Sequence, residues 1–176
     1  FEALKNSTAS YNTAVGYYAL GSNTTGEYNA AFGNGALDTN STGDKNTGLG
    51  YYALTGNTTG SYNTAIGNQS LLTNSTASHN TAIGHQAMYA NTTGTKNVAV
   101  GPNALDDNTT GDINIAIGFK ALTTNTTSIE NIAIGHEALE LNTTGAYNTA
   151  VGSFCLTDNT TGTKNTAVGR ASLAYN

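Results

Sequence analysis

Residues 12–28 read N-T-A-V-G-Y-Y-A-L-G-S-N-T-T-G-E-Y, and this 17-residue pattern recurs along the chain without insertion or deletion. Self-similarity at a fixed period indicates a repeat architecture, so we treat residues 1–176 as a single repeat domain. We number repeat positions 1 to 17 from the first asparagine of each unit. The units begin at Asn12, Asn29, Asn46, Asn63, Asn80, Asn97, Asn114, Asn131, Asn148 and Asn165.

The composition of the unit disfavours a helical array and favours short strands. Every unit carries glycine, asparagine and threonine, which are poor helix formers. The Thr-Ala-Val stretch before a glycine is typical of a strand, and Asn-Thr-Thr-Gly is typical of a turn. We therefore predict an all-β fold: a parallel β-solenoid of the β-roll type with ten 17-residue coils, each built from two short strands and two turns.

The invariant positions predict how the coils stack. Glycine at position 5 never varies, from Gly16 to Gly169, which predicts a positive φ or a close approach of two backbones. The asparagine at position 12 creates ten Asn-Ser/Thr-Ser/Thr sequences, from Asn6 to Asn159. They match the acceptor motif for N-linked glycans, but ten glycans about 4.8 Å apart would collide. We therefore expect an internal asparagine ladder.

The strand segment is apolar on both of its faces. Ala14 and Val15 are adjacent, so their side chains must point to opposite sides of a strand. Both positions are apolar in nearly every unit, with Gly48-Leu49 as the exception. A lone solenoid needs only one apolar face, so two faces predict burial in the coil's own core and burial against another chain.

The N-T-A-[V/I]-G motif resembles the N-S-V-A-I-G-type motif in the heads of YadA-like trimeric autotransporter adhesins. It is even more similar to the N-T-A-V-G-x-x-A-L repeats of phage-like tail fibres and other bacterial fibre proteins. The resemblance covers essentially the whole chain, although the repeat is longer here than in the adhesin heads. It implies a homotrimer of parallel β-rolls, intertwined or side by side about a threefold axis, in an extracellular, cell-surface or virion-like fibre.

Charge and hydropathy exclude two classes of partner. Charged residues make up 10% of the chain and the net charge is -5. There is no run of Lys or Arg, so the electrostatic footprint of a nucleic-acid-binding protein is absent. No apolar stretch approaches the roughly 20 residues that a membrane span needs. We expect neither nucleic-acid binding nor membrane insertion, and we expect the chain to be a segment of a longer fibre.

The reactive side chains do not form a pattern typical of an enzyme. Cys155 occupies an alanine position and is expected to be a packed small residue. Three histidines occupy variable positions, where we expect surface residues and no metal site. Four acidic residues are expected in exposed variable positions without a neighbouring general base. The sequence thus predicts no catalytic residue, metal or cofactor. These residues are His79, His85, His136, Asp106, Asp107, Glu137 and Glu140.

Tyrosines near the N-terminal end are the candidate ligand contacts. Tyr17, Tyr18, Tyr28, Tyr51 and Tyr52 occupy positions that vary between units. Aromatic rings on an exposed surface can stack on sugars or bury against a protein of a target cell. The same rings can also pack on one another across coils. Both interpretations remain open at this point, and we weight the packing role more heavily.

Two functions from different classes fit the sequence. The first is a structural and adhesive segment of a trimeric fibre, which acts as a rigid spacer and contacts a host or prey surface. The alternative is a monomeric ice- or surface-binding solenoid, which would use a flat threonine array. The threonines are adjacent, as in Thr24-Thr25 and Thr58-Thr59, so we expect one of each pair to turn inward. Oligomeric state separates the two functions.

Overall fold

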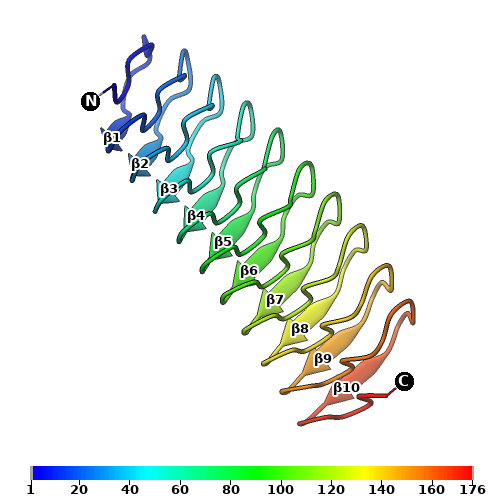
Figure 1. Cartoon of the computed structure of the whole chain (residues 1–176). Helices are drawn as coiled ribbons and strands as arrows, with labels where there is room; N and C mark the ends of the chain where they lie inside the picture. Colours follow the sequence, from blue (N-terminus) through cyan, green and yellow to red (C-terminus); the bar gives the residue numbers. More distant parts are fainter. Residues whose placement is uncertain (1, 176) are drawn as a thin grey trace.

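The computed structural model describes residues 2–175 and contains one strand in each repeat, with no helix among these residues. The ten strands form a single sheet in sequence order, β1 to β10 (Figure 1). The strands are β1 Thr13–Val15, β2 Ala30–Phe32, β3 Thr47–Leu49, β4 Thr64–Ile66, β5 Thr81–Ile83, β6 Val98–Val100, β7 Ile115–Ile117, β8 Ile132–Ile134, β9 Thr149–Val151 and β10 Thr166–Val168.

All neighbouring strands are parallel and pair with an offset of one repeat. Ala14 lies beside Ala31, and Ala150 lies beside Ala167. Identical repeat positions are therefore stacked along a rod, with the two chain ends at opposite ends of it (Figure 1). The predicted all-β parallel solenoid with 17 residues per coil is confirmed.

The prediction of a second strand in each coil is wrong. Backbone hydrogen bonds do join the coils on the return path, for example Leu20 N–H to the Ala36 carbonyl at 3.0 Å and Ser22 N–H to the Asp38 carbonyl at 2.9 Å. The path is not extended, however, because the leucine at position 9 has a left-handed φ of 50–56° in the coils from Leu20 to Leu173. The return side is thus bonded between coils but bent within each coil.

The core of most coils contains three small or medium apolar side chains, and Gly48 and Ser70 are exceptions at positions 3 and 8. Alanines at positions 3 and 8 and leucine at position 9 are fully buried, as at Ala31, Ala36 and Leu37. A left-handed conformation costs a non-glycine residue about 1–2 kcal/mol, whereas full burial of a leucine contributes about 1.5–3 kcal/mol. Burial therefore offsets the backbone cost at position 9.

Two buried asparagine ladders line the rest of the interior. At position 1, the Asn29 side-chain oxygen accepts the Asn46 backbone N–H at 2.9 Å. At position 12, the Asn40 side-chain amide donates to the Asn23 side-chain oxygen at 2.9 Å. The pattern repeats from coil to coil, and no buried side-chain polar atom of residues 2–175 lacks a hydrogen-bond partner. The expected internal ladder at position 12 is confirmed.

One carbonyl group in each coil joins the two ladders. The Gly43 carbonyl oxygen accepts from the Asn29 side-chain amide at 2.8 Å and from the Asn40 side-chain amide at 3.0 Å. A buried amide without partners costs about 1–3 kcal/mol. The two asparagines and the residue at position 15 therefore act as one hydrogen-bonded unit, and losing any member leaves buried polar groups unpaired.

The invariant glycine at position 5 satisfies both parts of its prediction. Gly84 has a φ of 138°, and a Cβ atom there would lie 2.6 Å from the carbonyl carbon and oxygen of Gly101. Position 7 varies between coils, but its side chain does not simply face solvent. Gln86 is half-buried, has a left-handed φ of 53°, and its amide lies 3.4 Å from the Gln69 side-chain oxygen.

We predict that Gly84→Val destabilises the rod far more than Gln86→Ala. The valine would meet the Gly101 backbone and a φ that β-branched residues avoid, so we expect a loss of at least about 2 kcal/mol. Gln86→Ala removes two long side-chain hydrogen bonds, one donated to Gln69 and one accepted from Asn103, and should change stability by about 0.5–1 kcal/mol. Thermal unfolding by circular dichroism measures both variants, and equal melting temperatures would contradict the assignment of position 5.

A second prediction tests the ladder at position 12. In Asn74→Asp, the introduced carboxyl group would be buried beside the Asn57 side-chain oxygen, which now accepts the Asn74 amide at 2.8 Å. Desolvation would raise the folded-state pKa of that group above its unfolded value. The loss of folding stability caused by this group is then absent at pH values below its unfolded-state pKa. It grows as the pH rises towards its folded-state pKa.

We therefore expect Asn74→Asp to lower the melting temperature more at pH 7 than at pH 4. The control is Asn68→Asp, at an exposed position of the same coil, which should show little change at either pH. A pH-independent loss in Asn74→Asp would argue against burial of this amide.

Candidate functional site

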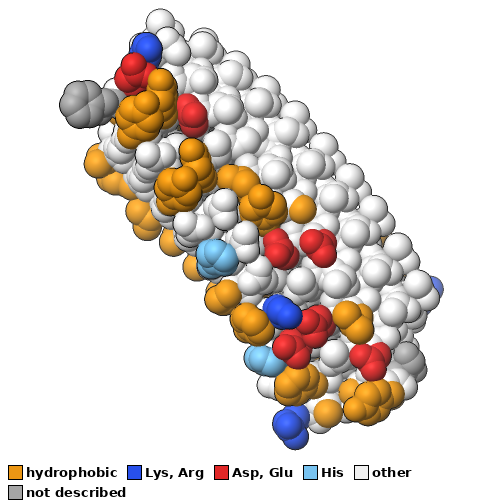
Figure 2. Space-filling model, viewed as in Figure 1, with side chains coloured by type: hydrophobic (Ala, Val, Ile, Leu, Met, Phe, Trp, Pro, Cys, Tyr) orange, Lys and Arg blue, Asp and Glu red, His pale blue; other side chains and the backbone are white. Residues whose placement is uncertain are grey.

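The side chains at positions 2 and 4 of the ten strands point away from the coil interior, and we call them the outer face. Alanine at position 3 is buried, so its neighbours lie on the opposite side of the strand. The position-4 residues are exposed or half-buried, and hydrophobic side chains run along the side of the rod where the strand arrowheads end (Figure 2). They are Val15, Phe32, Leu49, Ile66, Ile83, Val100, Ile117, Ile134, Val151 and Val168.

The outer face is most apolar in its middle coils. Position 2 is threonine in most strands, but it is Val98 in β6, Ile115 in β7 and Ile132 in β8. Both outward positions are therefore aliphatic in three adjacent strands. Ile117 and Ile134 in this region are 38% and 36% exposed. This region is the widest aliphatic area of the outer face.

Two columns of exposed side chains flank the outer face. The entry column is position 17, just before each strand, and the exit column is position 6, just after it. All members are exposed except Ser153, which is half-buried. The entry column is Tyr11, Tyr28, Lys45, Tyr62, His79, Lys96, Ile113, Glu130, Tyr147 and Lys164. The exit column is Tyr17, Asn34, Tyr51, Asn68, His85, Pro102, Phe119, His136, Ser153 and Arg170.

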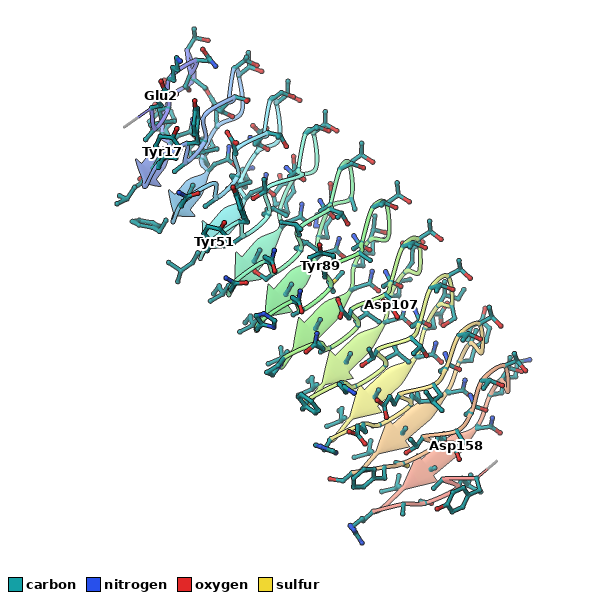
Figure 3. The ribbon with its side chains drawn as sticks, viewed as in Figure 1. Glu2, Tyr17, Tyr51, Tyr89, Asp107 and Asp158 are labelled. Carbon is teal, nitrogen blue, oxygen red and sulfur yellow. The ribbon has the colours of Figure 1, made fainter. Side chains whose placement is uncertain are left out.

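The five candidate tyrosines lie in three separate places. Tyr17 packs edge-on against Tyr18 with ring centroids 4.4 Å apart, and Tyr51 packs against Tyr52 at 4.2 Å. Figure 3 shows Tyr17 and Tyr51 near the arrowheads of β1 and β3, two coils apart. Tyr28 belongs to the entry column, where its ring stacks on another tyrosine. The five rings do not converge on one pocket.

The partners of these tyrosines favour packing. Tyr52 is half-buried, and its ring lies over the backbone of Gly35 in the preceding coil, where a Cβ atom would clash with it. A hydrogen bond to the Glu2 carboxylate raises the pKa of Tyr18, and one to Tyr52 raises the pKa of Tyr51. The ring faces of Tyr17 and Tyr51 remain about half exposed.

The histidines are surface residues, as predicted. His79 stacks on Tyr62 with ring centroids 4.9 Å apart, and His136 stacks on Phe119 at 5.4 Å. His85 is also exposed. In the part of the chain that the structure describes, no group of three or more His, Cys, Asp or Glu side chains could hold a metal ion.

The prediction of exposed acidic side chains is correct only for Asp107, which is exposed. Asp106, Glu137 and Glu140 are half-buried. Burial raises the pKa of Asp106, whose carboxylate accepts a hydrogen bond from Asn103 at 3.0 Å. These side chains are partly covered because they lie against the stacked neighbouring coils, which sequence variability does not reveal.

Cys155 is a packed small residue, as predicted. It is fully buried at position 8, where most coils have alanine, and its thiol lies 3.2 Å from the Ala167 carbonyl oxygen. Burial raises the pKa of this thiol, which disfavours the nucleophilic thiolate.

The Asn-Thr-Thr edge follows the expectation for its asparagines and only partly for its threonines. Asparagines from Asn23 to Asn159 at position 12 are buried, so an N-linked glycan there is incompatible with the fold. The prediction that one threonine of each pair turns inward is only partly right. Thr58 is half-buried and its hydroxyl donates to the Ser75 carbonyl at 2.9 Å, whereas Thr59 is exposed. Neither threonine is fully buried, because positions 12 and 15 already occupy the interior.

The entry column, as one continuous edge of this surface, was not predicted from the sequence. The strand period of two does not reveal it, because position 17 has a left-handed φ of 55–64° in the coils from Tyr11 to Lys164 and so lies outside the extended strand. The available signal is the fixed spacing of position 17, which stacks its side chains from coil to coil.

We predict that Tyr52→Ser lowers the melting temperature, whereas Tyr51→Ser does not. Tyr52 covers the Gly35 backbone, and its loss would leave that backbone exposed. The Tyr51 side chain is 48% exposed, so part of its ring is available for a ligand. Thermal unfolding of both variants tests the assignment. Lost adhesion of Tyr51→Ser to cells at an unchanged melting temperature would support recognition, and retained adhesion would support packing alone.

Comparisons with protein-family models, with curated proteins and with solved structures found no match. Among residues 2–175 there is no helix long and apolar enough to cross a membrane.

Proposed function

We propose that this chain is a structural and adhesive segment of an extracellular homotrimeric fibre, in which it acts as a rigid spacer. The single observation that carries the proposal is the apolar outer face. A column of Val, Ile, Leu and Phe side chains runs along all ten strands without a covering layer. Monomeric soluble proteins rarely leave a contiguous apolar surface of this kind in water.

The energetics favour association along the whole length of the rod. Covering the exposed part of one aliphatic side chain such as Ile117 would contribute roughly 0.5–1 kcal/mol. Association costs about 4–15 kcal/mol in translational and rotational freedom. One coil could not offset that cost, whereas ten stacked coils could. The resemblance to trimeric fibre repeats supports three chains rather than two.

The architecture suits a spacer. Every coil is bonded to its neighbours by strand pairing and by two asparagine ladders, so bending would break several buried hydrogen bonds at once. Three identical rods would also present each exposed side chain three times. Weak contacts to a glycan or protein of a target cell would then gain avidity.

A monomeric surface-binding solenoid is the second candidate. The observation that favours it is the threonine row at position 14, which is exposed in every coil from Thr25 to Thr161. None of these hydroxyl groups has a hydrogen-bond partner within residues 2–175, and none of the residues is replaced by serine. A monomeric mass in solution is what this candidate requires.

We predict a trimeric mass by light scattering and a monomeric mass for Ile117→Lys/Ile134→Lys. Both lysines would place a charge in the proposed contact, where desolvation is costly. The control is Leu141→Lys, since Leu141 is 41% exposed but lies at position 11, outside the outer face. Circular dichroism should show the same β spectrum for all three proteins.

The control should remain trimeric. A folded wild-type chain that is monomeric at micromolar concentration would overturn the proposal and favour the second candidate. A double variant that remains trimeric would show that the chains meet through another surface.

A further inference from the structure

The entry and exit columns cannot touch each other within one chain. Glu130 and His136 lie on either side of the three-residue strand β8 and are six residues apart, a stretch that spans up to roughly 20 Å. Contacts run along each column instead. In the entry column Tyr62 stacks on His79, and in the exit column Phe119 stacks on His136. No stacking, cation–π or ion-pair contact among residues 2–175 joins the two columns.

At five of the ten strands, the two residues that flank the strand nevertheless match in chemistry. The matched sets are two tyrosines, a cation with an aromatic ring, two histidines, two large apolar side chains, and an acid with a base. They are Tyr11 and Tyr17 at β1, Lys45 and Tyr51 at β3, His79 and His85 at β5, Ile113 and Phe119 at β7, and Glu130 and His136 at β8. These residues vary from coil to coil, so the match is not imposed by the repeat.

Among the remaining five strands, only one is flanked by residues that would repel each other. β2, β4 and β9 pair a tyrosine with asparagine or serine, and β6 pairs Lys96 with Pro102. These combinations are neutral or compatible with hydrogen bonding. Only β10 brings two like charges together, in Lys164 and Arg170.

Cyclic symmetry supplies a physical reason for the match. If the outer faces of identical parallel rods surround an axis along the rods, every strand runs in the same sense around that axis. The end of a strand in one chain then meets the start of the equivalent strand in the next chain. A heterologous contact of this kind joins one surface to a different surface of an identical partner. Exit and entry residues of the same coil therefore become neighbours.

We propose that the chains associate in parallel and in register, so that Glu130 of one chain binds His136 of the next and Ile113 packs on Phe119 of the next. This inference rests on the proposed function, since it specifies how the chains of the fibre meet. The Glu130 carboxylate accepts a hydrogen bond from an imidazole N–H group of the partner. The aliphatic strands β6–β8 lie beside this pair and form the most apolar part of the contact.

The surroundings of His136 leave it available for this contact. Within its own chain the ring lies 3.7 Å from the Glu137 carboxylate, which is too long for a hydrogen bond. Phe119 and Phe154 contact the ring through their faces and edges and leave its N–H groups without an acceptor. Glu130 has no ion-pair partner among residues 2–175.

An antiparallel arrangement explains the match less well. A twofold axis along the strand direction would make the two rods antiparallel and set β8 of one chain opposite β3 of the other. The starts of these two strands would then meet, which brings Glu130 near Lys45 of the partner. It would also place Ile113 against Tyr62 and Phe119 against Asn68. The match between residues that flank the same strand would then be accidental.

Disulfide trapping in the full chain tests the register. In a Cys155→Ala background, Glu130→Cys and His136→Cys are introduced together and the protein is oxidised. A disulfide needs Cα atoms within about 7 Å, so these two cysteines cannot join within one chain. We expect covalent trimers on denaturing gels. The matched controls are Glu130→Cys with Pro102→Cys, which requires a shift of two coils, and Glu130→Cys with Lys45→Cys, which requires antiparallel chains.

The outcomes separate this inference from the proposed function. Covalent trimers with the His136 pair alone support the parallel register, and covalent dimers with a dimeric mass support it with a twofold axis instead. A trimeric mass without trapping, or with trapping in a control pair, overturns the register but leaves the trimer. A monomeric mass before oxidation, with no trapping, overturns both proposals.

Discussion

The hydrogen-bonded unit of two buried asparagines and one carbonyl is the constraint on which the rod depends. Each coil buries two side-chain amides, and each amide needs a partner from its own coil and from the next one. That need is met only if the same residues recur at the same height in every coil. The strict period of 17, without a single insertion, follows from this requirement because one extra residue would orphan amides in two coils.

This constraint divides the repeat into an invariant interior and a variable surface. Asparagine, glycine, alanine and leucine occupy the interior and change little along the chain. Positions 6, 7, 10, 11, 16 and 17 vary between coils, and most of their side chains are exposed or half-buried. The outer face belongs to neither the invariant interior nor the variable surface. Its position-4 side chains stay apolar in every coil although they are not buried within the chain. Conservation of apolar character without burial is the reason to infer a second chain there.

The buried interior could be predicted from the sequence, because it depends on the same residue types recurring at a fixed spacing. Recurrence of Asn12 and Gly16 was sufficient for the solenoid, the ladder and the positive φ of the glycine. The return path could not be predicted, because Leu20 adopts a left-handed conformation that its residue type disfavours. That conformation is stabilised by burial against other coils, which local sequence preference does not register. For the same reason the variability of position 7 does not reveal that Gln86 is half-buried.

The threonine row at position 14 has a different status from every other invariant position. Position 13 accepts both serine and threonine because its hydroxyl only has to donate to the next coil, as Ser41 and Thr58 do. Position 14 is threonine at all ten of its occurrences, from Thr8 to Thr161, although no hydrogen bond within residues 2–175 uses the hydroxyl from Thr25 onwards. The row also lies outside the outer face, so chains that meet through that face would leave it in solvent. The methyl and hydroxyl groups together, repeated at the coil spacing, are therefore the most uniform surface that an assembled fibre would present.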